Sequence, residues 1–135
     1  MAIIDTIILA SEGKLSFGDY LSSDKRKVTD FELDGNLYNV KTHKLLTRLE
    51  KNNGLLLETV PGSTIHGLEV SNDATEFLIE GLENSQITME LEGATDYKIY
   101  VDSVQVGLTT SSKSGKISFS LELCDEPKKV EIVKL

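Results

Sequence analysis

The clearest pattern in this chain is an alternation of apolar and polar residues between Leu91 and Leu123. Tyr97, Ile99 and Val101 fall on one face of an extended segment, and the residues between them fall on the other. Successive side chains of a strand point to opposite faces, so the pattern predicts strands with one buried and one solvated face. Because antiparallel sheets alternate in this way and parallel strands read as continuous apolar runs, we expect an antiparallel sheet.

Similar short segments, separated by turn residues, run along the rest of the chain. We expect strands over Ile3–Ala10, Lys14–Tyr20, Val28–Leu33, Leu37–Thr42, Ile65–Val70, Glu76–Glu80, Gln86–Leu91, Tyr97–Val101, Val104–Thr109, Lys116–Leu123 and Lys129–Val133. Strands at this spacing, joined by Gly, Asn, Asp and Ser, indicate a sandwich or a barrel. The predicted fold class is all-β, an antiparallel β-sandwich of immunoglobulin/fibronectin III-like or jelly-roll-like type. Residues 1–54 would form an N-terminal hairpin layer packed on a sandwich of residues 55–135, or the two would form one continuous domain.

Two segments fit more than one structure. The isoleucines of Ile3–Ala10 also fit helical spacing, but the β-branched residues favour a strand. Residues 42–51 could place three leucines on a short helix. Asn53-Gly54 follows this segment and Leu55–Val60 reads as extended, so we expect a hairpin over Leu45–Val60.

Three turns are expected from local chemistry. Glu12-Gly13 separates the first two predicted strands. Asp34-Gly35-Asn36 is a strong hairpin signal, because Asp-Gly tolerates the positive φ of a type I′ turn. Pro61-Gly62 predicts a turn in which proline presets φ and Gly62 takes a positive φ.

Charge and cysteine content limit the possible partners and locations. The 135 residues carry a formal net charge of −8, which disfavours nucleic acid because phosphate contacts need Lys and Arg. A single cysteine, Cys124, excludes an internal disulfide. The N-terminus lacks a basic region and Asp5 interrupts its apolar run, so we expect neither a signal peptide nor a membrane span. The expected location is the cytoplasm or a particle assembled in it.

The sequence contains no spacing typical of a metal or nucleophile site. His43 and His66 form no ligand pair, and one cysteine completes no zinc set. We interpret each histidine as a surface or strand-end residue and Cys124 as a small buried hydrophobe. We therefore expect no metal, no cofactor and no catalytic residue.

Carbohydrate chemistry is harder to exclude. Carboxylates are abundant, so the sequence leaves a glycosidase pair open, but any chosen pair is unspecific. We expect solvated positions for most members of one group, namely Glu76, Glu80, Glu83, Glu90 and Glu92. Tyr100 lies on the polar face of its predicted strand and is the best candidate for an exposed sugar-binding platform, followed by Tyr38. A role for Tyr100 in cross-strand packing is the alternative.

Two short motifs resemble known families. Leu91-x5-Tyr97-x-Ile99-x-Val101 resembles the tyrosine corner of fibronectin type III domains, in which the hydroxyl bonds to upstream backbone. The resemblance implies that Tyr97 is buried and bonded to backbone near Leu91–Gly93. The following segment resembles the small C-terminal sandwich domains of polysaccharide-degrading enzymes, through Tyr97, Val101-Asp102, Gly107 and Gly115–Phe119. These motifs are structural. Together with the Pro61-Gly62 turn, they predict structural roles for Tyr97, Leu91, Pro61, Gly62 and Gly115.

The chain as a whole resembles short proteins of spore-forming Firmicutes, some of which are labelled endosialidase. The resemblance rests on Leu15–Tyr20, Val60-Pro61-Gly62 and Asp96-Tyr97-Lys98. Sialidase chemistry generally relies on an arginine cluster that holds the substrate carboxylate. This chain has only Arg26 and Arg48, so we expect no endosialidase activity.

The function expected from these observations is a non-catalytic interaction or assembly module that works as a homo-oligomer. The N-terminal segment carries apolar residues on both faces of a predicted strand, namely Ile3, Ile4, Ile7, Ile8 and Leu9. Such an edge needs a cover, and a symmetric second copy would supply it. Cover from within the chain, by Lys44–Glu50, is the alternative. The alternative function is a carbohydrate-binding or glycosidase-associated accessory module, and the partners considered are the chain itself, another protein or a polysaccharide.

Overall fold

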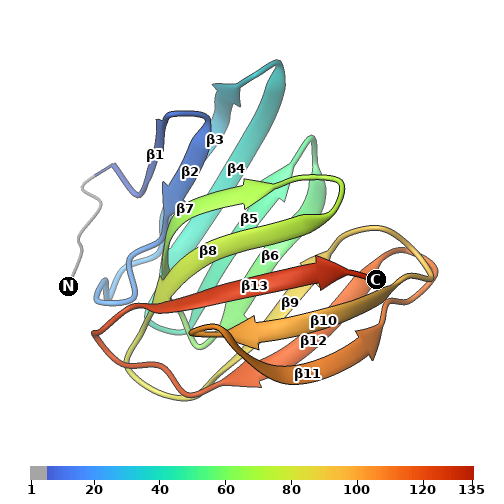
Figure 1. Ribbon diagram of the computed structural model, residues 1–135. Coiled ribbons are helices and arrows are strands. Elements are labelled where there is room, and N and C mark those ends of the chain that lie inside the picture. Colours follow the sequence, from blue (N-terminus) through green and yellow to red (C-terminus); the bar gives the residue numbers. More distant parts are fainter. Residues whose placement is uncertain (1–5) are drawn as a thin grey trace.

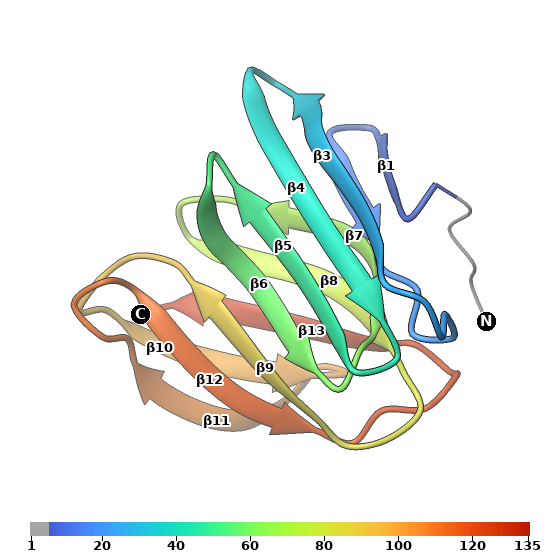
Figure 2. The same cartoon turned by 180° about the vertical axis from the view of Figure 1, so that it is seen from behind.

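The computed structural model describes residues 6–135, which form thirteen strands in two antiparallel sheets (Figure 1). Sheet A has the spatial order β1 (Ile8–Ser11), β2 (Lys14–Phe17), β7 (Thr64–Val70), β8 (Ala74–Glu80), β13 (Lys128–Lys134), β10 (Asp96–Val101) and β11 (Val104–Thr110). Sheet B, in front in Figure 2, has the order β12 (Lys116–Leu121), β9 (Ser85–Glu90), β6 (Gly54–Val60), β5 (Leu46–Lys51), β4 (Asn36–His43) and β3 (Arg26–Leu33). The predicted all-β sandwich is confirmed.

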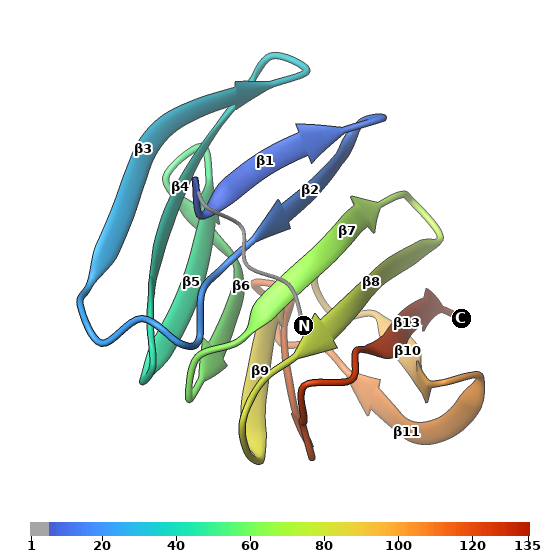
Figure 3. The same cartoon turned by 90° about the vertical axis from the view of Figure 1, so that its left-hand side faces the viewer.

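The core lies between the two sheets, which form separate layers in Figure 3. Alternation decides which side chains enter it: along β8, Phe77 and Ile79 are buried, whereas Leu78 between them is exposed. The facing layer of sheet B contributes Val40, Leu49, Leu57, Ile87 and Met89. Removing these side chains from water supplies the main driving force for the fold, at about 25 cal/mol per Å² of apolar surface.

Hairpins within each sheet close with the turn chemistry that the sequence contains. Asp34-Gly35 has φ values of 51° and 80°, as expected for its two-residue turn. The hairpin expected over Leu45–Val60 is also present, and the helix considered for residues 42–51 is not. Its turn is Asn52-Asn53, one residue earlier than expected, with φ values of 50° and 68°. The described residues contain no helix long and apolar enough to cross a membrane.

The N-terminal hairpins extend the two sheets instead of forming a layer of their own. The β1–β2 hairpin joins sheet A through the pairing of β2 with β7. Strands β3 to β5 join sheet B through the pairing of β5 with β6. The boundary expected between residues 54 and 55 falls inside the β5–β6 hairpin, so backbone pairing makes the two parts one sandwich.

The N-terminal strand is shorter than expected. It covers Ile8–Ser11 and begins directly after Ile7, whose φ of +57° is not that of a strand. Ile7 and Ile8 are both buried in the core of their own chain, whereas Leu9 is exposed. Ile3 and Ile4, on which the expectation of a two-faced apolar edge also depended, lie outside the described residues.

Candidate functional site

A carboxylate is completely buried at the end of β8. Glu80 lies on the outer face of sheet A by the alternation of its strand, yet its exposed fraction is 0%. The Tyr20 hydroxyl, from the segment that connects β2 to β3, donates to Glu80 Oε2 at 3.2 Å. His66 Nε2 on β7 lies 2.9 Å from Glu80 Oε1. The interpretation of Glu80 as solvated is therefore wrong, whereas His66 is partly exposed on the outer face of sheet A.

Burial of Tyr20 has an electrostatic consequence. Desolvation, together with the charge of Glu80 and the hydrogen bond to it, raises the pKa of Tyr20 to about 12. A phenol that loses its proton next to a carboxylate would place two negative charges in a poorly solvated site. Folded Tyr20 therefore keeps its proton to higher pH than an ordinary tyrosine, and its hydroxyl stays a donor to Glu80.

A hollow of about 360 Å³ lies beside His66 on the outer face of sheet A. A β-bulge at Gly67, whose φ is +64°, places Glu69 directly opposite Glu76. Each of these carboxylates is paired with a lysine: Lys14 with Glu69 at 3.9 Å and Lys129 with Glu76 at 3.4 Å. Among residues 6–135, no group of three or more His, Cys, Asp or Glu is arranged to hold a metal ion.

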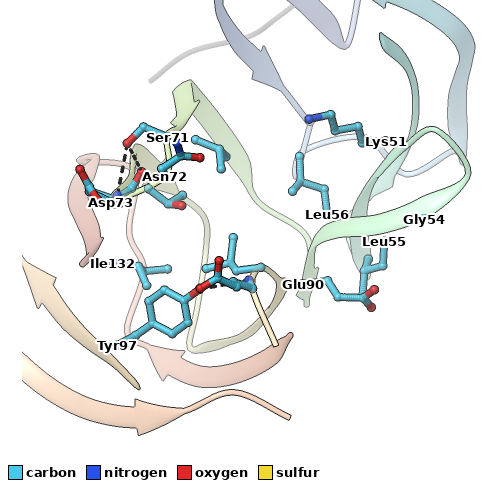
Figure 4. A pocket seen from close by; sticks show the side chains of 15 residues that line it. Lys51, Gly54, Leu55, Leu56, Ser71, Asn72, Asp73, Glu90, Tyr97 and Ile132 are labelled. Atoms are coloured by element: carbon cyan, nitrogen blue, oxygen red, sulfur yellow. Dashed lines mark hydrogen bonds between the residues drawn. The ribbon is translucent and has the colours of Figure 1, made fainter. Parts of the chain in front are cut away.

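A second pocket, of about 400 Å³, opens between the sheets at the opposite end of β8 (Figure 4). Leu56, Tyr97 and Ile132 line it together with the β7–β8 turn. The buried Tyr97 hydroxyl accepts a hydrogen bond from the Glu92 N–H at 3.1 Å, which is the contact expected of a tyrosine corner. This hydrogen bond fixes the connection between β9 and β10.

An ion pair fastens the same connection to the C-terminal strand. Lys134 Nζ lies 2.7 Å from Glu92 Oε2. The hydrogen bond to Lys134 lowers the pKa of Glu92, and the reciprocal bond raises the pKa of Lys134. Both groups are at the surface, so we attribute only a small part of the stability to them.

Close backbone approach explains the expected structural glycines. A Cβ on Gly115 would lie 2.1 Å from the carbonyl oxygen of Leu91, and its φ is +94°. A Cβ on Gly62 would lie 2.1 Å from the carbonyl oxygen of His43. Gly62 does not have the positive φ that was expected, and the Val60–Pro61 bond is cis. Space, not backbone handedness, therefore requires glycine at position 62.

A buried hydroxyl network supports this corner of the sandwich, and sequence reasoning missed it. Thr47 Oγ1 bonds to Thr42 Oγ1 at 2.8 Å and donates to the Ser63 carbonyl at 2.8 Å. Thr59 Oγ1 lies 2.7 Å from Ser63 Oγ. The available signal was threonine at inward-facing positions of three strands of sheet B. Every buried side-chain nitrogen or oxygen among residues 6–135 has a hydrogen-bond partner.

The two candidate sugar-binding tyrosines lie on different sheets. Tyr38, on β4, is only 7% exposed, and burial followed by the charge of Asp34 raises its pKa. Tyr100, on β10, is half-buried on the outer face of sheet A, between Glu131 of β13 and Gln105 of β11. The structure therefore does not combine Tyr38 and Tyr100 into one platform.

The remaining histidine and the cysteine lie at strand ends. His43 is the last residue of β4 and is buried. Cys124 lies three residues beyond the end of β12 and is exposed, whereas the preceding Leu123 is buried. The interpretation of Cys124 as a buried hydrophobe is wrong.

The free edges of the sheets differ in chemistry, and one of them is the best candidate for an interaction site. Strand β11, at the lower edge of sheet A in Figure 1, has no charged residue in its seven positions. Three of its side chains are exposed and apolar: Val104 (62%), Val106 (57%) and Leu108 (64%). Strand β3, which forms the edge of sheet B at the opposite end of the sandwich, carries Arg26, Lys27, Asp30 and Glu32. Charges discourage strand addition, so β11 is the less protected edge.

Comparison of the chain with protein-family models, with curated proteins and with solved structures found no match. The fold and the candidate site therefore rest on the residues and contacts described above.

Proposed function

We propose that this chain is a non-catalytic interaction or assembly module that works as a homo-oligomer. The observation that carries the proposal is the exposed, uncharged edge strand β11. An edge strand presents unpaired N–H and C=O groups that can pair with another chain, and natural edges usually prevent this with charges, bulges or short length. A homo-oligomer would cover this surface.

The edge that supports association is not the N-terminal one expected from the sequence. Ile7 and Ile8 pack into the core of their own chain, which leaves Leu9 as the exposed apolar residue of β1. The opposite edge of sheet A has three such residues on one strand. We therefore propose β11 as the interface, in place of the N-terminal strand expected from the sequence.

A non-catalytic role also agrees with the positions of the two arginines. Arg26 Nη1 lies 3.0 Å from Asp19 Oδ2, and Arg48 Nη1 lies 2.6 Å from Glu58 Oε2. Each guanidinium is held by a carboxylate of its own chain. We therefore expect no release of sialic acid from polysialic acid by the pure protein.

The solution mass tests the proposal. Sedimentation equilibrium at tens of micromolar should give an oligomer for the full-length chain, and Leu108→Lys should lower the mass toward the monomer. Leu45→Lys is the matched control, because Leu45 is equally exposed (69%) but lies in the β4–β5 turn. A monomeric full-length chain would refute the homo-oligomer.

A second candidate function, carbohydrate binding, is favoured by the position of Tyr100. Its ring lies on the outer face of sheet A between Glu131 and Gln105, which supply polar groups that could bind hydroxyls. Affinity electrophoresis in gels that contain soluble polysaccharides should then show retardation that Tyr100→Ala removes. Thr88→Ala, on the outer face of sheet B, should leave any retardation unchanged.

A further inference from the structure

A third hollow, of about 280 Å³, lies between the two sheets beside the β3–β4 turn. Leucines from both sheets form its walls, with Leu15 and Leu68 from sheet A and Leu33 and Leu56 from sheet B. Tyr38, on β4, lines the hollow next to them. A mostly apolar hollow with a few polar groups is the usual form of a site for a small molecule.

The polar group inside this hollow is the hydroxyl of a buried tyrosine. Two other buried tyrosines use their hydroxyls within the chain, since Tyr20 donates to Glu80 and Tyr97 accepts from the Glu92 N–H. Tyr38 is only 7% exposed, yet its hydroxyl has no hydrogen-bond partner among residues 6–135. Every fully buried side-chain oxygen in that range has a partner, so the Tyr38 hydroxyl reaches solvent through the hollow. Buried tyrosine hydroxyls ordinarily find a partner, and here a ligand can supply it.

The charges around the hollow favour a cation near this hydroxyl. Asp34 and Glu69 both line it. Glu69 is paired with Lys14 at 3.9 Å, whereas Asp34 has no ion-pair partner in the described part of the chain. Burial, followed by the charge of Asp34, raises the pKa of Tyr38, so this carboxylate acts on the hydroxyl. An ammonium group can donate to a carboxylate and to a phenol oxygen at the same time.

We infer that this hollow binds an aliphatic amine, with the ammonium group between Asp34 and the Tyr38 hydroxyl and the alkyl chain along the leucines. The inference goes beyond the proposed homo-oligomer and is independent of it, because β11 contributes no residue to the hollow. The chain needs no hydrogen bonds, so apolar walls suit it. Each CH₂ group that enters the hollow should tighten binding by about fourfold at most.

The hollow adjoins the pocket shown in Figure 4, because the two share Lys51, Leu56 and Val70. A longer alkyl chain can therefore continue past Leu56 into that pocket. Lys51 lies opposite Tyr38 in the β4–β5 ladder and has no ion-pair partner within residues 6–135. Its positive charge opposes a bound ammonium group, whereas an anionic ligand would depend on it. Lys51 therefore distinguishes the two kinds of ligand.

Isothermal titration calorimetry at pH 7, with probes of equal chain length, tests the inference. We expect octylamine to bind, because an alkylamine is protonated at this pH as a lysine side chain is. Octanoate, which Asp34 repels, and 1-octanol, which has no charge, should bind at least about tenfold more weakly. Hexylamine lacks two CH₂ groups and should bind about tenfold more weakly than octylamine.

Substitutions can remove the polar groups of the site and keep the fold. Asp34→Asn places a residue that tolerates the φ of 51° found there, and should weaken octylamine binding about tenfold. Tyr38→Phe removes a hydroxyl without a partner in the described chain, so binding should weaken about three- to tenfold while the melting temperature of the unliganded protein stays unchanged. Lys51→Gln should tighten octylamine binding. Glu126→Gln, in the connection between β12 and β13, removes the same charge outside the hollow and is the matched control for Asp34→Asn.

The outcomes decide between an amine and other ligands. Octylamine binding that Asp34→Asn and Tyr38→Phe weaken, and that Glu126→Gln leaves unchanged, supports the inference. A preference for octanoate that Lys51→Gln abolishes would assign the hollow to an anionic amphiphile and overturn it. No binding of octylamine would also overturn it, as would equal weakening by Asp34→Asn and Glu126→Gln, which would show attraction to the net charge of −8 alone. The solution mass enters none of these results, so the homo-oligomer stands or falls separately.

Discussion

At its β7–β8 region sheet A buries a carboxylate, whereas at its β11 edge it leaves three apolar side chains exposed. Glu80 is covered because the segment that connects β2 to β3 places Tyr20 against it. On β11, by contrast, Val104, Val106 and Leu108 stay exposed, and the chain turns directly from β10 into β11 at Asp102-Ser103.

The two regions differ in what their outer-face side chains depend on, although the sequence pattern of their strands does not distinguish them. A buried polar group must find its hydrogen bonds within the chain, so Glu80, Tyr20 and His66 depend on one another. An exposed apolar residue depends on nothing within the chain, so Leu108 is free to serve an intermolecular contact. Substitutions in the first region should therefore cost stability, and substitutions in the second should cost association.

The largest effect is expected at Glu80. Glu80→Ala would remove the acceptor of the Tyr20 hydroxyl and the partner of His66, and would leave a cavity. We expect a loss of about 3–5 kcal/mol in the free energy of unfolding, measured with urea. Glu76→Ala on the same strand removes a surface carboxylate and should cost less than about 1 kcal/mol. An equal loss of unfolding free energy in the two variants would contradict the difference expected between the buried and the surface carboxylate.

High pH should weaken the same cluster. An unfolded tyrosine loses its proton near pH 10, whereas folded Tyr20 keeps its proton up to about pH 12. The folded state therefore binds more protons in this window, and stability should fall as pH rises from 10 to 12, by at most about 2–3 kcal/mol.

Urea unfolding at several pH values in this window checks the expected fall. Tyr20→Phe should remove that part of the pH dependence, because phenylalanine has no proton to lose. An unchanged slope in Tyr20→Phe would show that other groups cause it.

Two tyrosines on β10 test, within one strand, the contrast between a buried hydrogen-bonded side chain and one on the outer face. Tyr97→Phe would leave the Glu92 N–H without its acceptor, and we expect a loss of about 1–3 kcal/mol. Tyr100→Phe, on the opposite face, should change stability by less than about 0.5 kcal/mol. Thermal unfolding of both variants provides the measurement, and an unchanged melting temperature in Tyr97→Phe would argue against the tyrosine corner.

The smallest effect on stability is expected at the β11 edge. Leu108→Lys replaces an exposed side chain, so unfolding of the monomer at low protein concentration should change by less than about 0.5 kcal/mol. The same variant is expected to lose association. A loss of stability above about 1 kcal/mol would mean that Leu108 packs within its own chain.

Much of the fold follows from local sequence signals. Alternation located many of the strands among the described residues, because a half-buried strand needs a period of two, and β-branched residues and turn signals located β1 and β5. Turn chemistry located hairpins such as the one at Asp34-Gly35, because Asp-Gly accepts the positive φ values found there. The resemblance of Leu91–Val101 to a tyrosine corner pointed to the connection that the Tyr97 hydroxyl fixes, and this contact joins residues only five positions apart.

The sites depended on contacts that no local pattern contains. Alternation correctly places Glu80 on the outer face of β8, and an outer face ordinarily means water. Tyr20, 60 residues away, removes that water by a path that only the arrangement of the sheets decides. In the same way, β11 is an edge of sheet A because the next strand of the chain, β12, joins sheet B instead of pairing with it. Periodicity encodes which side of a strand faces inward, whereas the burial of its outer face and its place in the sheet are set by long-range pairing.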